Sequence, residues 1–95
     1  MFSIYRDQTA MTSLQGTWEH AEPALKEAIL QATRRLDRLL QDQPQEQGES
    51  REGRSRILFE APLGIIFEVD EAMKLVRILQ AWTFRTAADR RNGQE

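Results

Sequence analysis

The spacing of apolar residues changes several times along the chain, and each spacing predicts a different kind of element. Phe2 and Ile4 alternate with polar residues, which predicts a short strand that ends at the turn-forming and helix-capping Asp7. Apolar residues then recur every three or four positions, as they do on one side of a helix. These residues are Met11, Leu14, Trp18 and Ala21, and they predict a first helix over residues 9–19.

A second helix follows after a short break. Pro23 fits the first turn of a new helix, where the N–H that proline lacks would have no partner within the helix. Beyond it, apolar residues form one stripe and charged residues face the other way. The stripe contains Leu25, Ile29, Ala32, Leu36 and Leu39. Two adjacent helices on a short connection predict an antiparallel helical hairpin.

The second half of the chain has the period of strands. Residues 41–53 are polar, with Pro44 and two glycines, and predict a solvated loop. Alternation of period two then predicts two strands joined by a turn at Ala61 and Pro62. Residues 75–82 predict a last strand, whose register stays open because Arg77 and Gln80 interrupt its two faces.

The predicted elements occur in the order β-α-α-β-β-β, which indicates an α+β fold. We expect the helical hairpin to pack on one face of a mostly antiparallel four-stranded sheet. The expected contacts join the helical stripes to the alternating residues of the two middle strands. The residues are Leu14, Trp18, Leu25, Ile29 and Leu36 on the helices and Ile57, Phe59, Ile65 and Phe67 on the strands. We expect one domain over residues 1–84 and a polar, flexible tail over residues 85–95.

Composition narrows the chemistry that the chain can perform. The 95 residues include no cysteine and a single histidine, His20. Disulfides, thiolate metal sites and clusters of histidine ligands are therefore excluded, and we expect neither a metal nor another cofactor. The net charge of −2 gives no overall basic field to attract nucleic acid. No apolar stretch reaches the length of a membrane span or of a signal segment, so we expect a cytoplasmic protein without a membrane partner.

Positive charge is gathered in three short segments. Their arginines are Arg34, Arg35 and Arg38, then Arg51, Arg54 and Arg56, and finally Arg85, Arg90 and Arg91. Such clusters on helices and strand ends are usually solvated surface, and this is the favoured interpretation of each cluster taken alone. The two tryptophans, Trp18 and Trp82, are likewise interpreted as packing residues rather than as platforms for stacked bases.

Four segments of the second half carry a family resemblance when they are taken with the element order. They are 48–51 (Gly-Glu-Ser-Arg), 56–59 (Arg-Ile-Leu-Phe), 62–70 (Pro-Leu-Gly-Ile-Ile-Phe-Glu-Val-Asp) and 76–79 (Val-Arg-Ile-Leu), followed by Trp82. Over nearly its whole length the chain resembles the RelE/ParE superfamily of toxins from bacterial type II toxin–antitoxin systems. The resemblance implies a cognate antitoxin protein as a partner.

One branch of that superfamily cuts messenger RNA on the ribosome, with a cluster of basic residues on the open face of the sheet. Such a cluster activates the ribose 2′-hydroxyl and stabilises the charge that develops on the phosphate. The resemblance assigns this role to three candidate catalytic residues, Arg54, Arg56 and Arg85. Alternation is expected to place Arg54 and Arg56 opposite Ile57 and Phe59, away from the helices. Arg85 resembles a terminal phosphate-binding arginine.

The sequence departs from the nuclease pattern in its acids and bases. Gly64 stands where nuclease members usually carry an arginine, and no tyrosine or histidine follows the last strand. Glu49 and Glu60 are interpreted as solvated or arginine-paired acids rather than as proton carriers. Loss of a positioned acid or base costs about a hundred- to ten-thousand-fold in rate. The resemblance therefore implies a weak endoribonuclease at most.

Two other functions fit the same fold. A second branch of the superfamily inhibits DNA gyrase and carries no catalytic residues, so the missing acids and bases do not count against it. A third alternative is a protein-interaction module that keeps the toxin fold without toxicity. Besides the antitoxin, the implied partners are the ribosome with messenger RNA, or DNA gyrase.

The open face of the sheet is also a predicted protein-binding surface. Leu58 and Ile66 are expected to alternate onto it beside the cations, with Arg51 and Arg77 as further binding residues. An acidic and apolar antitoxin segment would cover this face. The alternatives are dimerisation through the face, coverage by the chain's own tail, and packing of both apolar residues inside the fold.

Overall fold

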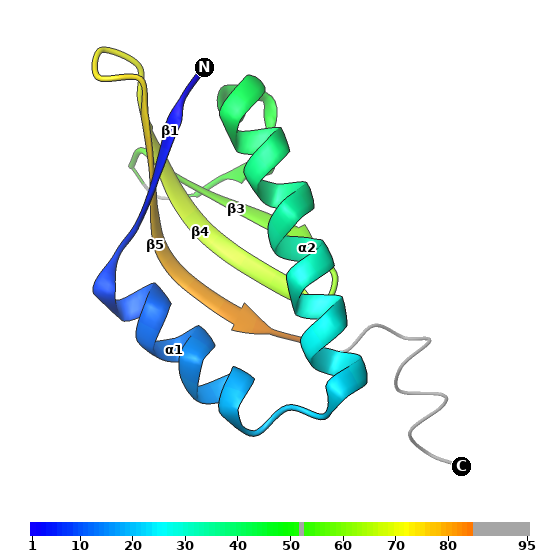
Figure 1. The fold of residues 1–95 in the computed structure, drawn as a ribbon. Helices are drawn as coiled ribbons and strands as arrows, with labels where there is room; N and C mark the ends of the chain where they lie inside the picture. The colour runs from blue at the N-terminus through cyan, green and yellow to red at the C-terminus, as the bar shows by residue number, and fades with distance from the viewer. Residues whose placement is uncertain (52, 85–95) are drawn as a thin grey trace.

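Two helices lie on one side of a five-stranded sheet, as Figure 1 shows. The computed structural model describes residues 1–51 and 53–84. In chain order the elements are β1 (Ser3–Arg6), α1 (Gln8–Glu19), α2 (Pro23–Asp42), the 3-10 helix η1 (Pro44–Glu46), β2 (Glu49–Ser50), β3 (Ser55–Glu60), β4 (Leu63–Asp70) and β5 (Leu75–Thr83).

The sheet is mixed, with the strand order β1-β5-β4-β3-β2. β1 runs parallel to β5, and the other neighbours are antiparallel. The predicted α+β class is confirmed, but the described sheet has five strands where four were predicted. The additional strand is β2, which pairs Glu49 with Ile57 and Ser50 with Arg56. Both residues of β2 are exposed, so no apolar alternation marks this strand in the sequence.

Each helix begins where the sequence provides a suitable first residue. Asp7 precedes α1 in an extended conformation, and its carboxylate accepts a hydrogen bond from the N–H of Gln8 at 2.8 Å. Pro23 is the first residue of α2. α1 packs on β5, whereas α2 packs on β1, β3 and β4. The two helices therefore cover separate parts of the sheet.

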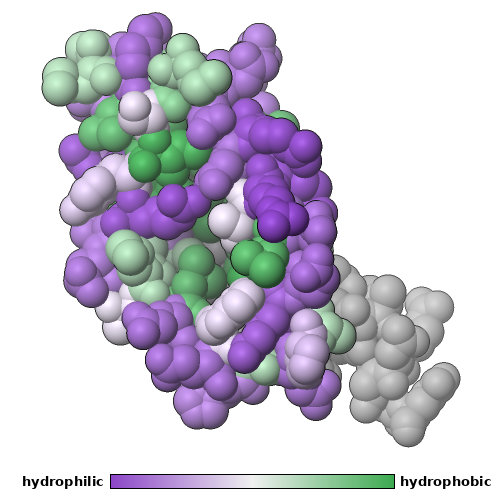
Figure 2. Space-filling view, viewed as in Figure 1, coloured by the Kyte–Doolittle hydropathy of each residue, from purple (hydrophilic) through white to green (hydrophobic). Residues whose placement is uncertain are grey.

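A small apolar pocket remains between the two helices. Core side chains such as Leu14, Leu36 and Ile78 line it, and Figure 2 shows apolar surface in the hollow between the helices. Arg6 of β1 and Asp37 of α2 border the pocket and form an ion pair, with 2.7 Å between Nη2 and Oδ1. This pair ties the edge strand to the longer helix.

The core lies between the helices and the sheet. Of the residues predicted to meet there, Ile29, Leu36, Ile65 and Phe67 are buried. Three more are partly buried and pack against this core, namely Leu14, Trp18 and Leu25. The predicted packing of the helices on the sheet is therefore confirmed for these residues.

At one position in each helix, the buried residue is the neighbour of the residue that the apolar stripe predicted. In α1, Ala10 is buried and Met11 is 52% exposed. In α2, Leu40 is completely buried, while Leu39 is only partly so. Two apolar residues are adjacent at each of these positions, so spacing alone does not decide which one faces the sheet.

The predicted facing of β3 is wrong. Ile57 and Phe59 were expected to contact the helices, yet Phe59 is 55% exposed and Leu58 packs against the core instead. Glu60 points to the same side as Leu58, because its carboxylate accepts a hydrogen bond from Arg35 of α2 at 2.6 Å. Both sides of β3 carry apolar residues, so alternation could not identify the core side. The pairing with β4 identifies it, since Leu58 is opposite the buried Ile65.

An irregularity in β5 explains why its register could not be read from the sequence. Ile66 of β4 pairs with Gln80, but the next residue, Phe67, pairs with Ile78. Leu79 is therefore an extra residue in β5, as in a β-bulge. The bulge reverses the alternation, so that Arg77 and Gln80 lie on the same face of the sheet although they are three residues apart.

Candidate functional site

The face of the sheet that points away from the helices is the candidate functional site, and we call it the open face. Its residues follow from the strand pairing, because directly paired residues share a face. They are Ser3 and Tyr5 on β1, Ser55, Ile57 and Phe59 on β3, Gly64, Ile66, Glu68 and Asp70 on β4, and Leu75, Arg77, Gln80 and Trp82 on β5. One end of this face is aromatic and the other is charged.

Three aromatic rings form the apolar end, which we call the aromatic ledge (Phe59, Trp82 and Phe84). The ring of Phe59 meets Trp82 edge-on, with centroids 6.1 Å apart and an interplanar angle of 79°. It meets Phe84 in the same way at 5.4 Å and 83°. Edge-to-face contacts are a favoured arrangement of aromatic pairs. Phe59 is nevertheless 55% exposed, so the ledge presents apolar surface to the outside.

The ring of Trp82 lies against Gly64, in the space that a side chain at this position would occupy. A Cβ at position 64 would be only 2.6 Å from Cε2 of Trp82, closer than real Cβ atoms approach other atoms. Trp82 is paired with Gly64 across β4 and β5 and rests on the open face. Its interpretation as a core-filling residue is therefore corrected, whereas Trp18 does pack against the core.

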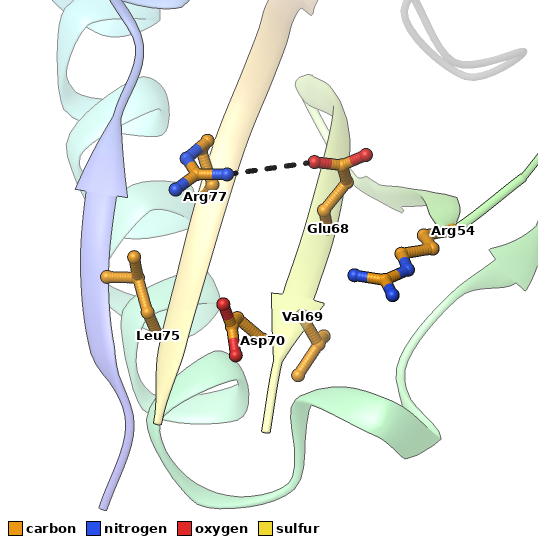
Figure 3. Close-up of a pocket in the computed structure, with 6 residues that line it drawn as sticks. All are labelled: Arg54, Glu68, Val69, Asp70, Leu75 and Arg77. Carbon is orange, nitrogen blue, oxygen red and sulfur yellow. Dashed lines mark ion pairs between the residues drawn. The ribbon is translucent and has the colours of Figure 1, made fainter. Parts of the chain in front are cut away.

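The charged end of the open face is drawn in Figure 3. Arg54, Glu68, Asp70 and Arg77 line a pocket there together with Val69 and Leu75. Nη1 of Arg77 lies 4.0 Å from Oε1 of Glu68, a loose ion pair. The pocket holds about 40 Å³, whereas small-molecule sites usually occupy about 300–1,000 Å³. It is therefore too small to be a ligand-binding cleft.

Arg56 does not lie where its candidate catalytic role requires it. Its guanidinium donates to the carbonyl oxygens of Gln47 and Gly48 at 2.8 and 3.0 Å, and to Oγ of Ser50 at 3.2 Å. Arg56 has the same alternation as Leu58, so its side chain leaves β3 on the helix side. The predicted placement of Arg56 on the open face is wrong, and its guanidinium instead holds the segment that leads into β2.

Of the other two candidate catalytic residues, only Arg54 lies within the part of the chain that the structure describes. Arg54 is exposed at the edge of the open face, and within the described part of the chain it forms no hydrogen bond or ion pair. It also borders a second hollow, which it shares with Arg56 on the other side of the sheet edge. Arg85 and the predicted tail, residues 85–95, lie outside the described residues.

The four predicted binding residues do not all lie on the open face. Ile66 lies on the open face as predicted but is buried, at 9% exposure. Arg77, whose face was left open by the sequence, lies on the open face too, paired with Glu68. Leu58 was expected there too, and that placement is wrong because the side chain packs against the core. Arg51 is exposed beside β2, where its backbone N–H donates to the carbonyl of Ser55.

The aromatic ledge was not predicted from the sequence. Two signals pointed to it, namely apolar residues on both sides of β3 and a glycine, Gly64, in the middle of an apolar strand. Strand glycines often mark the close approach of another group, and here that group is the ring of Trp82.

Within residues 1–51 and 53–84, no group of three or more histidine, cysteine or acidic side chains is arranged to hold a metal ion. No helix in that same part of the chain is long and apolar enough to cross a bilayer.

Comparison with known proteins gives a consistent result for the fold. No family model and no curated protein matches the sequence. Among solved structures, a chain of the chromosomal ParDE toxin–antitoxin system from P. aeruginosa aligns with a TM-score of 0.68 and 20% identity, covering 90% of this chain and 98% of that one.

Two RelE-type structures are similar over a comparable extent. The RelBE2 toxin–antitoxin complex from Mycobacterium tuberculosis aligns with a TM-score of 0.61 and 16% identity, over 87% of this chain and 98% of that one. The isolated E. coli RelE toxin aligns with a TM-score of 0.62 and 12% identity, over 99% and 97% of the two chains. The chain therefore has the same fold as these ParDE, RelBE2 and RelE structures, as the sequence resemblance predicted.

Proposed function

We propose that this chain is the toxin of a type II toxin–antitoxin system, held inactive in the cytoplasm by a cognate antitoxin. The observation that carries the proposal is the extent of the structural likeness. The aligned region covers at least 97% of the three similar chains, and all three belong to toxins or toxin–antitoxin assemblies. Fold alone does not fix function, so the action of the toxin must follow from the chemistry of the open face.

We further propose that the toxin acts by binding a target protein rather than by cutting RNA. Arg56 uses its guanidinium to hold the segment before β2. Gly64 lies beneath Trp82, so this position offers a ring where nuclease members usually carry an arginine. A surface of aromatic rings and balanced charges is suited to protein recognition. On this proposal, the gyrase-inhibiting branch of the superfamily is the better guide to the target.

Growth experiments test the assignment as a toxin. Expression of the chain alone is expected to arrest bacterial growth, and co-expression of a cognate antitoxin, to be sought in the neighbouring open reading frame, should restore growth. Growth that continues at full rate, together with no complex between the two purified proteins, would contradict the assignment. That outcome would support the alternative of an interaction module without toxicity.

Two assays with purified protein separate the modes of action. In the first, the protein is added to translating ribosomes with messenger RNA, and in the second to gyrase with relaxed plasmid. We expect inhibition of supercoiling and no cuts in ribosome-bound message. Phe59→Ser should abolish the inhibition, whereas Met11→Ser, a change of a similarly exposed residue on α1, should not. Cuts in the message would contradict the proposed action while leaving the toxin assignment intact.

A further inference from the structure

We propose that the open face is a self-association surface, on which a second copy of this chain packs face to face. The inference concerns the isolated chain and does not depend on toxin activity. Three properties of the described open face support it: an exposed aromatic ledge, a balanced set of charges, and an area suited to a weak dimer.

The aromatic ledge supplies the apolar contact. Phe59 is the most exposed aromatic ring of the ledge that the structure describes, at 55%, although its edge-on contacts with Trp82 and Phe84 fix its position. Aromatic side chains are enriched at protein–protein interfaces. Rings that are already held in place lose little conformational freedom when they are covered. The ledge is therefore prepared for a partner that also presents apolar side chains.

The charges of the open face suit a second copy of the chain. Figure 3 shows two guanidinium groups, of Arg54 and Arg77, beside the carboxylates of Glu68 and Asp70. A polyanion such as RNA, or a uniformly acidic segment, would meet as many like as opposite charges here. A two-fold related copy presents the same balanced set, so each guanidinium can be placed near a carboxylate of the other chain.

Two of these charges remain available for such pairs. Arg54 makes no hydrogen bond or ion pair within the described residues, and the contact between Arg77 and Glu68 spans 4.0 Å. Neither arginine would have to give up a strong interaction within its own chain. The contacts between the two chains would therefore add to the existing ones instead of replacing them.

The size of the face sets the expected strength. β4 has eight residues, about 26 Å at about 3.3 Å per residue, and four strands span about 19 Å at about 4.8 Å each. The open face therefore offers at most about 500 Å² per copy, or about 1,000 Å² in total, which corresponds to a weak, transient complex. We expect a dimer that forms and dissociates with protein concentration.

Sedimentation velocity of the full chain, from low micromolar to several hundred micromolar concentration, tests the proposal. The mean mass is expected to rise from 11.0 kDa towards twice that value as the concentration increases. Phe59→Glu should keep the protein monomeric throughout the range. Met11→Glu is the matched control, because Met11 is 52% exposed but lies on α1, in the helix layer, and it should dimerise like the unmodified chain.

A charge-reversal pair tests whether the partner is a second copy. Arg77→Glu alone and Glu68→Arg alone should each weaken self-association, because each leaves the face with an excess of one charge. An equimolar mixture of the two variants should associate again, since the excess charges are then opposite. Circular dichroism checks that each variant is folded. If Phe59→Glu does not fold, the charge-reversal variants still test whether the chain associates with itself. A wild-type chain that stays monomeric at every concentration, or a mixture that does not associate, overturns the proposal.

Discussion

At the scale of single residues, the shape of the open face depends on the lack of a side chain at position 64, which is a glycine. Gly64 lies in the middle of β4, and the ring of Trp82 occupies the space where a Cβ would be. The ring is thereby held edge-on to Phe59. An arginine at position 64 would exclude Trp82 from this place, so an aromatic ledge and a strand arginine are alternatives at the same site.

Gly64→Ala is expected to displace Trp82 and to lower the free energy of unfolding by about 1 to 3 kcal/mol, as overpacking does. Chemical unfolding followed by tryptophan fluorescence measures both effects, because the environment of Trp82 changes with its position. Gly16→Ala is the matched control, since nothing lies within 4 Å of a Cβ at that exposed position of α1. It should stabilise the chain by about 0.5 to 1 kcal/mol. Equal effects of the two changes would show that Trp82 does not require Gly64.

At the scale of elements, the sequence predicted where helices and strands lie better than it predicted which way they face. The apolar stripe of α2 identified Ile29 and Leu36 as core residues because its other side is charged. β3 has no such contrast, since Ile57, Leu58 and Phe59 are all apolar, and its facing was predicted the wrong way round. Register is fixed by pairing with β4, which is long-range information that a local pattern does not contain.

The same limit explains the outcome for the candidate site. Ile66 was placed on the open face correctly, because the facing of β4 was predicted the right way round. The face of Arg77 could not be predicted, because the extra residue Leu79 interrupts the alternation of β5. Arg56 and Leu58 were misplaced together, since one wrong facing moves every residue of a strand to the other side. The strand β2 was missed because its two exposed residues carry no apolar signal.

The packing of α2 can be tested with Leu36→Ala. Leu36 is 4% exposed in the core between α2 and the sheet. Removal of a buried leucine side chain is expected to lower the free energy of unfolding by about 2 to 5 kcal/mol. Leu30→Ala on the same helix is the control, because Leu30 is 39% exposed, and it should change stability by less than about 1 kcal/mol. Urea denaturation gives both values, and a similar cost for the two would mean that α2 packs through another face.

The edge of the sheet depends on Arg56, whose hydrogen bonds hold the segment that leads into β2. Arg56→Ala should destabilise the chain by about 1 to 3 kcal/mol, since three hydrogen bonds to a charged group are lost. Hydrogen exchange should accelerate at the amides of β2 while the core strands stay protected. Arg54→Ala removes an exposed arginine two residues away and should leave exchange in β2 unchanged. Faster exchange in both variants would argue against the holding role of Arg56.

At the scale of the whole molecule, one side of the sheet forms a small core with the helices and the other side is the open face. Both helices lie on one side of the sheet, so the open face is covered by no element that the structure describes. A domain of this length has little stability to spare. Coverage of the open face, whether by an antitoxin or by a second copy, would therefore stabilise the fold as well as block the proposed binding surface.

This coupling predicts that thermal stability depends on protein concentration. A partner that binds only the folded chain raises the unfolding temperature by mass action, and for a dimer that partner is the protein itself. The Tm of the unmodified chain should therefore rise across the same concentrations at which its sedimenting mass increases. Phe59→Glu should have a Tm that is independent of concentration, whereas Met11→Glu should behave like the unmodified chain. A constant Tm in samples whose mass has doubled would mean that dimerisation does not involve the folded sheet face.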